Sequence, residues 1–438
     1  MRHILIGLIF CVLTSAHAFC GFYVGKADSQ LFNEASKVII ARDGNRTVLS
    51  MANDYRGEVN EFALVVPIPY VFEESQIQVG SASIFDRVDA YSAPRLVEYF
   101  DEDPCWIHDR ERMFDILPSA PTMESAGALP SEDALGVTIE ASFSVGEYDI
   151  LMLSAEESDG LETWLLQNDY NIPAGAAEVF NRYIAMGMKF FVARVNLAEF
   201  EATGNVLLRP LAMAFESDEL MLPIQLGTVN AAGKQDLVVF LLSPEGRIVT
   251  DNYRMVNIPS DVNLPEYVDE NFADFYVSMF QAVSEREQTG QGVTFLEYAW
   301  DMSWCDPCAA DPLTDDELAQ AGVFWNIDNR GGAPNVYLTR LHLRYDRESH
   351  PEDLQFRVTN NRDNFQGRYI LQRPFDGVIT CQEGEEYING VVQRQKREAE
   401  QLANLTGWEL AEIQANITPY NPEVDFPEWW ETLFDRLR

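Results

Sequence analysis

The chain has 438 residues, of which 70 are acidic and 31 are basic, so its formal net charge at pH 7 is −39. A field this negative repels phosphate backbones and anionic lipid headgroups, which argues against nucleic-acid binding and leaves cations or cationic partners open. Hydrophobic residues make up 47% of the chain, enough to build the cores of two or three domains.

The N-terminus has the three parts of an export signal. Residues 1–3 are short and basic, residues 4–13 form an apolar run, and Ala16-His17-Ala18 places small residues where a signal peptidase reads them. The apolar run is too short to span a bilayer, which takes about 20 residues. We therefore predict a signal peptide at 1–18 and a mature protein that is exported to the periplasm or secreted, with no later transmembrane segment.

The first half of the mature chain predicts a β-rich domain at 19–117. Apolar runs at 38–42 and 47–51 flank Asp43-Gly44-Asn45, which favours a hairpin because glycine tolerates positive φ. A third run at 61–66 is expected to end at Pro67, since proline cannot donate a ladder hydrogen bond. Residues 118–133, rich in Pro, Ser, Ala and Gly, predict a linker or exposed loop.

The second half mixes strand and helix patterns. In an α+β domain at 134–262, runs at 219–226 and 236–242 predict a pair of antiparallel strands, and helices are expected near 159–166 and 173–186. Aromatic residues spaced from 267 to 283 predict a buried helix face in an α+β region at 263–385. A helix at 391–413 belongs to a helical tail, 386–438. The expected fold class is α+β, with predominantly antiparallel β-sheet domains, inserted helices and a helical C-terminal part.

Motifs spread along the chain carry a family resemblance. They are CGFYV at 20–24, ALVVPIP at 63–69, DAYSAPRLVEYF at 89–100, VGEYDI at 145–150, SDGLETWL at 158–165, CDPC at 305–308 and TRLH at 339–342. Together they resemble an uncharacterised bacterial family catalogued as domain of unknown function 2330, over about residues 20–380. The resemblance implies export and a shared scaffold, and it implies no activity.

Five cysteines remain after signal removal: Cys20, Cys105, Cys305, Cys308 and Cys381. Disulfides are the default interpretation in an exported protein, and an odd number leaves one thiol free, paired between chains or bound to something else. Closing a long loop, such as Cys20 to Cys105, would stabilise the fold by about 2–5 kcal/mol. The sequence leaves the connectivity open.

The Cys-x-x-Cys at Cys305 and Cys308 has three interpretations. As a redox pair it resembles the thioredoxin active-site pattern, with Cys305 as nucleophile and Cys308 as resolving thiol, but such a thiolate is usually stabilised at a helix N-terminus. Here the capping box, Thr314 to Glu317, begins a helix only later, and the aspartates around the motif oppose thiolate formation. These features favour a structural disulfide.

A zinc site is the third interpretation, because Cys105-x-x-His108 together with Cys305 and Cys308 would supply Cys₃His ligands. Disulfide chemistry competes for the same sulfurs outside the cytoplasm. No hydrolase motif is present, and the alternation around His342 indicates an ordinary strand residue.

The preferred interpretation is a non-enzymatic periplasmic or secreted protein, stabilised by disulfides, that binds an unknown ligand or envelope protein and needs no cofactor. The alternative is a periplasmic thiol–disulfide oxidoreductase.

Overall fold

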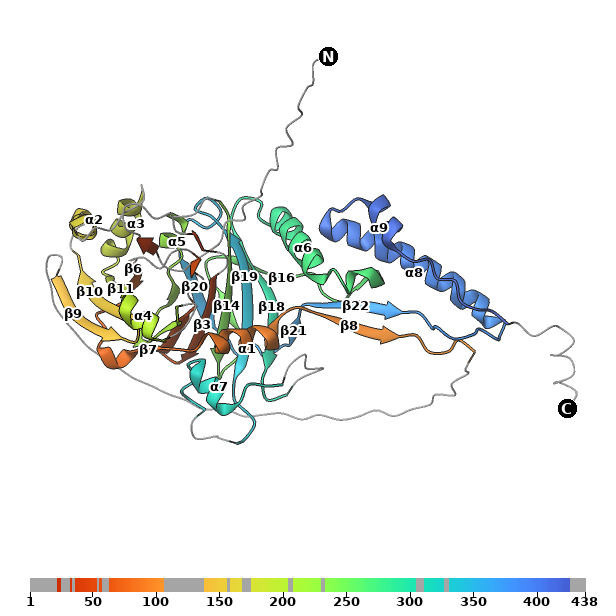
Figure 1. Cartoon of the computed structure of the whole chain (residues 1–438), viewed down its shortest axis with the longest axis horizontal. Helices are drawn as coiled ribbons and strands as arrows, with labels where there is room; N and C mark the ends of the chain where they lie inside the picture. The colour runs from red at the N-terminus through yellow and green to blue at the C-terminus, as the bar shows by residue number, and fades with distance from the viewer. Residues whose placement is uncertain are drawn as a thin grey trace, which may run out of the picture.

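The computed structural model describes residues 22–24, 32–33, 36–52, 55–56, 63–105, 138–155, 158–167, 175–203, 208–229, 233–304, 311–326 and 331–425. Two large sheets form the body of the molecule, and helices lie over their outer faces (Figure 1). The sheets are mostly antiparallel and two helices follow them at the C-terminal end. The predicted fold class, α+β with predominantly antiparallel sheets and a helical C-terminal part, is confirmed.

The larger sheet is built from nine strands: β3 (Ser36–Asp43), β4 (Arg46–Met51), β7 (Ile77–Val79), β12 (Leu211–Glu216), β14 (Gln235–Ser243), β16 (Arg254–Asn257), β18 (Val293–Asp301), β19 (Tyr337–Tyr345) and β21 (Phe365–Gln366). Their order is β16-β18-β19-β14-β3-β4-β12-β7, with β21 beside β18. The strands come from all three segments predicted as separate domains, 19–117, 134–262 and 263–385. These segments therefore share one sheet.

The predicted hairpin around Gly44 is confirmed in this sheet. Strands β3 and β4 pair antiparallel, with Asp43 opposite Arg46, and Gly44 has a φ of 56°. A positive φ at the tight turn costs glycine little because it has no Cβ. The local sequence signal was sufficient here because the two strands are neighbours along the chain.

The smaller sheet has five strands, in the order β1 (Phe22–Val24), β6 (Ala63–Ile68), β11 (Lys189–Val195), β10 (Tyr148–Ser154) and β9 (Thr138–Val145). The expected strand end at Pro67 was wrong, since β6 runs through Pro67 to Ile68 and pairs with β11 there. In the described residues β1 pairs only with Ala63–Val65. Proline is tolerated at Pro67 because the ladder with β1 does not reach it.

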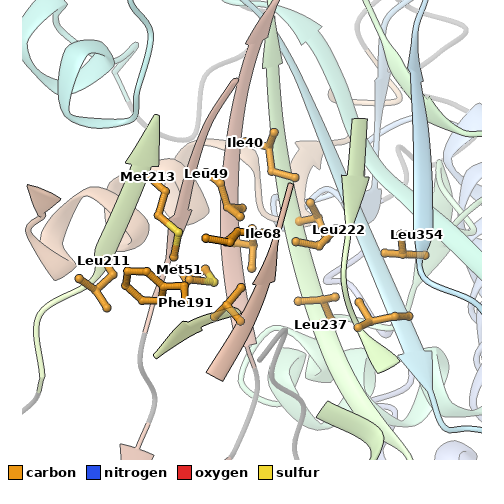
Figure 2. Close-up of a cluster of buried hydrophobic side chains, with 14 of the residues drawn as sticks. Ile40, Leu49, Met51, Ile68, Phe191, Leu211, Met213, Leu222, Leu237 and Leu354 are labelled. Atoms are coloured by element: carbon orange, nitrogen blue, oxygen red, sulfur yellow. The ribbon is translucent and has the colours of Figure 1, made fainter. Parts of the chain in front are cut away.

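The two sheets pack face to face around the main core. Along β14, alternate residues Leu237, Val239 and Leu241 lie in this core, while Val238, Phe240 and Leu242 lie on the other face. Figure 2 shows Met51 on β4, Phe191 on β11 and Leu237 on β14 within this core. Because both faces of β14 are buried, its residues from Leu237 to Leu242 are all apolar rather than alternating.

Helices lie over the outer faces of both sheets. The helix bounds are α1 (Ala82–Ser92), α2 (Ser158–Gln167), α3 (Ala176–Ala185), α4 (Leu197–Thr203), α5 (Gln225–Val229), α6 (Phe272–Glu287) and α7 (Asp315–Gln320), with 3₁₀ turns η1 (Glu74–Gln76) and η2 (Glu266–Val268). Phe200 of α4, by contrast, lies in the core between the two sheets. Helices α1 and α7 share a core with the larger sheet, and α2 and α3 share one with the smaller sheet. The capping box predicted at Thr314 is confirmed, because Thr314 caps α7 and Glu317 completes the box.

Short strands complete the fold: β13 (Leu220–Leu222), β15 (Ile248–Thr250) and β20 (Leu354–Val358) in one sheet, β8 (Arg95–Phe100), β17 (Val262–Leu264) and β22 (Arg368–Arg373) in another, and β2 (Phe32–Asn33) with β5 (Tyr55–Arg56). The expected pairing of the runs at 219–226 and 236–242 was wrong. Strand β13 pairs with β20, whereas β14 joins the larger sheet between β19 and β3. Strand propensity is local, but the choice of partner depends on the rest of the fold.

The C-terminal helices α8 (Glu383–Thr406) and α9 (Leu410–Asn416) lie with β8, β17 and β22, and we call these five elements the arm. Strands β8 and β22 and helix α8 extend together away from the two sheets (Figure 1). The single helix expected at 391–413 is divided at Gly407, which has a φ of 75°. The predicted buried face of α6 is confirmed, because Phe275 and Met279 pack against Leu402 and Ile413 of the arm. No helix in the part of the chain that the structure describes has the length and apolar character needed to cross a bilayer.

Candidate functional site

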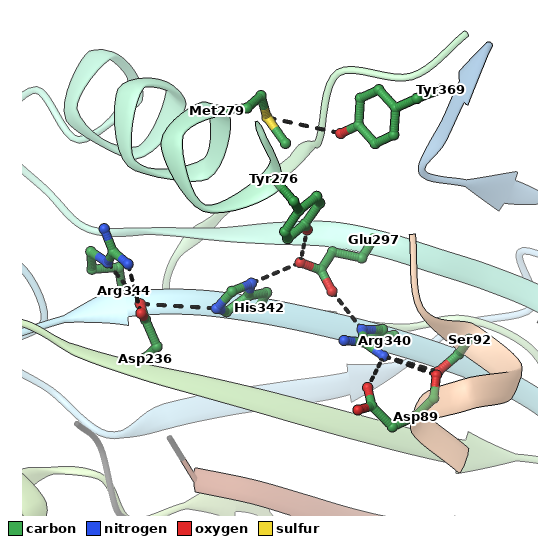
Figure 3. Close-up of polar contacts among 10 residues, drawn as sticks. All are labelled: Asp89, Ser92, Asp236, Tyr276, Met279, Glu297, Arg340, His342, Arg344 and Tyr369. Carbon is green, nitrogen blue, oxygen red and sulfur yellow. Dashed lines mark hydrogen bonds and ion pairs between the residues drawn. The ribbon is translucent and has the colours of Figure 1, made fainter. Parts of the chain in front are cut away.

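A buried charge cluster joins α1, α6, β18 and β19 (Figure 3). The carboxylate of Glu297, which is fully buried, accepts hydrogen bonds from Arg340 Nε at 2.5 Å, from His342 Nδ1 at 2.7 Å and from the hydroxyl of Tyr276. Arg340 also pairs with Asp89 on α1. His342 lies in β19, so the prediction that it is an ordinary strand residue is confirmed.

The charges within this cluster balance one another. Burial by itself would raise the pKa of Glu297, but the positive charge of Arg340 and then the interaction with His342 bring the pKa down to about 2. Glu297 therefore stays ionised at physiological pH beside a permanently charged arginine. Neither of the two cavities described below includes a residue of this cluster. We interpret it as a structural connection between the helices and the larger sheet.

A cavity of about 740 Å³ opens in the arm, between η2, the end of β22, α8 and the segment that follows α9. We call it the arm cavity. Its wall carries two arginines, Arg373 and Arg394, and six carboxylates: Glu266, Asp269, Glu270, Asp376, Glu398 and Glu423. The wall is therefore strongly negative.

Both arginines of the wall are already bound to carboxylates. Arg373 Nη2 lies 2.5 Å from Glu98 Oε1 and 2.9 Å from Asp269 Oδ2, and its Nη1 lies 3.3 Å from Glu266. These bonds, first the one to Glu98, raise the pKa of Arg373. The negative charge of the cavity thus exceeds what its arginines neutralise.

Arg394 is held by Asp101, which follows β8. Its Nη2 donates to Asp101 Oδ2 at 2.8 Å, and Tyr387 donates to the same oxygen at 2.6 Å. Burial would raise the pKa of Asp101, but the hydrogen bonds from Arg394, Tyr387 and Gln372 lower it overall. The acidic stretch at 101–103 thus uses Asp101 to hold α8.

Glu398 differs from the other carboxylates of the cavity because it is buried and incompletely bonded. It is 5% exposed, and no hydrogen bond from the described residues reaches its Oε1. The nearest positive group, Arg394 Nε, lies 3.6 Å away, which is too long for a good hydrogen bond. Burial raises the pKa of Glu398 to about 7, against the smaller opposing effect of Arg394. The side chain can therefore hold or release a proton near neutral pH.

The rest of the wall combines three aromatic side chains with prolines and amides, and hydrogen bonds hold it in place. Tyr267, Phe375 and Tyr420 line it, and Tyr420 Oη donates to the carbonyl of Phe375 at 2.7 Å. Gln395 on α8 donates to the carbonyl of Thr418 at 3.0 Å and accepts from the Tyr420 amide at 3.2 Å. The segment after α9 is thus tied to α8.

A second, smaller cavity of about 150 Å³ is lined by four methionines, Met186, Met188, Met213 and Met221, between the two sheets and β13. Methionine side chains adapt to many apolar shapes. Nothing in the structure indicates an occupant, so this cavity is a weaker candidate than the arm cavity. Among the described residues, no three His, Cys, Asp or Glu side chains gather in a geometry that would hold a metal ion.

The structure joins two of the candidate cysteines. Cys105, just after β8, and Cys381, just before α8, form a disulfide with their Cα atoms 5.4 Å apart. Cys105 therefore bonds Cys381 rather than Cys20, and while bonded it has no thiolate to offer zinc. The disulfide ties the strand and the helix of the arm together.

The other predicted site residues, Cys20, His108, Cys305 and Cys308, lie outside the described residues, as do the linker at 118–133 and the signal peptide. The redox pair and the remaining connectivity stay predictions. Sequence reasoning missed the arm cavity because its walls come from four separate stretches of the chain. The one local signal was the spacing of Arg394 and Glu398, four residues apart on a helix, which is a common surface arrangement.

The chain is an α+β protein with two packed sheets and a disulfide-bonded arm. It belongs to the bacterial family described as "Uncharacterized protein conserved in bacteria" (DUF2330), whose family model matches residues 14–357. The match includes both large sheets except β21 and ends before β22 and α8, so most of the arm cavity lies beyond it. No curated protein and no solved structure matches the chain.

Proposed function

We propose that this protein is an exported ligand-binding protein, periplasmic or secreted, and that the arm cavity is its binding site. The observation that carries the proposal is Glu398, a buried carboxylate on the cavity wall with an oxygen that receives no hydrogen bond from the described residues. An unsatisfied buried polar group costs stability. A ligand that donates a hydrogen bond to it would offset that cost.

The size and construction of the arm cavity support this proposal. Small-molecule sites usually measure about 300–1,000 Å³ and combine apolar walls with a few polar groups. The arm cavity measures about 740 Å³ and combines aromatic walls with buried and exposed carboxylates. Its walls are held by hydrogen bonds within the protein, so little ordering is needed on binding.

Export is supported by the tripartite pattern of residues 1–18 and by the Cys105–Cys381 pair, since disulfides persist in oxidising compartments. N-terminal sequencing of the protein recovered from the cell envelope or medium tests this part of the proposal. We expect the mature chain to begin at Phe19. A full-length chain found in the cytoplasm would contradict export.

Binding is tested by thermal-shift screening of the full chain against a mixed library of amino acids, sugars, nucleosides, fatty acids and amines. Thr418→Trp places a bulky ring in the cavity from an exposed position, and Gln401→Trp adds the same ring to an exposed position of α8 that does not line the cavity. We expect ligands that stabilise the wild type and Gln401→Trp but not Thr418→Trp. If no compound distinguishes these variants, the arm cavity is not a binding site.

A further inference from the structure

We propose that the arm cavity binds a small organic polycation, an apolar stem with two or more ammonium groups, and that Glu398 accepts a hydrogen bond from one ammonium group. This inference rests on the proposed function and names its ligand class. A linear polyamine has this chemistry.

The charge of the cavity selects for a cation. The wall carries six carboxylates against two arginines, and Arg373 and Arg394 are bound to acidic partners that include Glu98 and Asp101 outside the wall. Among the described residues, Glu270, Asp376 and Glu423 have no side-chain hydrogen bond or ion pair. An anionic ligand would face this excess negative charge without a free cation to receive it.

The distribution of the carboxylates favours several positive charges on one molecule. Glu270 follows η2, Asp376 follows β22, and Glu423 follows α9, so these groups stand on different walls of a cavity of about 740 Å³. A single small ion cannot contact all of them. A flexible chain with separated ammonium groups can.

The aromatic walls suit the same ligand. Tyr267, Phe375 and Tyr420 offer ring faces or edges to an alkyl stem, and ammonium groups bind the faces of aromatic rings favourably. The Tyr420 ring is fixed by its bond to Phe375 and by edge contact with the Tyr387 ring, whose centroid is 5.9 Å away.

Glu398 gives the site a proton-linked readout. The charged groups that act on it are Arg394 and Arg397 on its own helix, Glu266 on η2 and Asp101 after β8. Because its pKa is about 7, an ammonium group that binds the ionised form must displace a proton from part of the molecules at neutral pH. Binding of a polycation therefore releases protons, and its affinity falls as the pH falls from 8 to 6.

The test is isothermal titration of the full chain with spermidine at 0.15 M salt, where attraction to distant surface charges is largely screened. We expect one site per chain in the wild type. Glu398→Gln should weaken binding about tenfold or more, as expected for loss of a charge-assisted hydrogen bond, and should abolish proton release measured in two buffers of different ionisation enthalpy. Glu400→Gln, an exposed carboxylate on the same helix, is the matched control and should change the affinity less than twofold.

Parallel titrations with trilysine, Ca²⁺ and neutral triethylene glycol separate the alternatives. If Glu398→Gln and Glu400→Gln change spermidine affinity equally, the binding is general surface attraction and the inference is overturned. Tighter Glu398-dependent binding of trilysine or Ca²⁺ without spermidine binding also overturns it. If a library compound is excluded by Thr418→Trp while spermidine does not bind, the proposed function stands and the inference fails. If no compound is excluded, both fail.

Discussion

Replacing Glu398 by glutamine should make the protein less sensitive to rising pH. An unfolded glutamic acid releases its proton near its ordinary pKa of 4.5, whereas Glu398 in the folded protein keeps its proton up to about 7. Between these values the folded state holds more protons than the unfolded state. The wild-type free energy of unfolding therefore decreases as the pH rises through this window, and the decrease is complete above pH 7.

The size of this effect follows from the gap between the two pKa values. The gap is about 2.5 pH units, and each unit corresponds to about 1.4 kcal/mol, so ionised Glu398 destabilises the folded state by about 3 kcal/mol above pH 7. Glutamine does not ionise and removes this dependence. Its amide adds a constant offset from its own unmet hydrogen bonds, which does not vary with pH.

The assay is urea unfolding of the wild type and Glu398→Gln at pH values from 4.5 to 8, with hydrogen exchange in α8 as a local measure of arm stability. The quantity of interest is the stability difference between the two proteins, because other titrating groups affect both alike. We expect this difference to shift by about 3 kcal/mol in favour of Glu398→Gln between pH 4.5 and pH 8. Glu400→Gln should follow the wild type.

A stability difference that stays constant from pH 4.5 to 8 would refute the reasoning. It would mean that Glu398 is ionised in the folded protein at low pH and has a donor or solvent contact that the buried geometry does not provide. As the pH rises to 8, the Glu398→Gln variant is expected to lose less stability than the wild type, although it binds the ligand more weakly. That combination is typical of a residue kept for binding rather than for folding.

Three further predictions concern the rest of the fold. Arg340→Ala should lower the free energy of unfolding, measured in urea, by about 3–5 kcal/mol, because it leaves Glu297 buried without its main countercharge. The control Arg357→Ala, in an exposed pair with Asp251, should cost at most about 1 kcal/mol, and equal losses would contradict the buried-cluster interpretation. A disulfide map should contain the Cys105–Cys381 bond, and removing that bond should destabilise the chain by up to about 5 kcal/mol because the two cysteines are 276 residues apart. The same map across a glutathione series tests the redox alternative, because Cys305 and Cys308 must reduce near about −120 to −270 mV to act as exchange catalysts. Burial lowers the pKa of His350 from 6.5 to about 4, so the unfolded chain binds this proton at a higher pH than the folded protein does. The free energy of unfolding should therefore fall by about 3 kcal/mol as the pH falls from 6.5 to 4. His350→Asn should remove that part of the pH dependence, and an unchanged pH profile would show that the ring is solvated.

Much of the local structure could be predicted from the sequence. The hairpin at Gly44, the capping box at Thr314 and the apolar face of α6 each depend on residues within one or two turns or strands of one another. The fold class followed from the same local patterns. Prediction failed where a residue type is compatible with more than one local structure. Pro67 lies within β6 because the neighbouring strand β1 does not pair with it, and Gly407 divides the expected helix because it adopts a left-handed backbone conformation.

The sequence by itself determined which stretches become strands and helices, since hydrophobic periodicity and capping are local properties. Only the tertiary structure decided that β14 lies between β3 and β19, which are about 200 and 100 residues away along the chain, so that three predicted domains share one sheet. It also decided that Glu398 is buried in an acidic cavity rather than exposed on a helix surface. The physical reason is that a side chain's burial, and hence its pKa and its missing hydrogen-bond partner, depends on the segments that pack against it, and no local pattern specifies those segments.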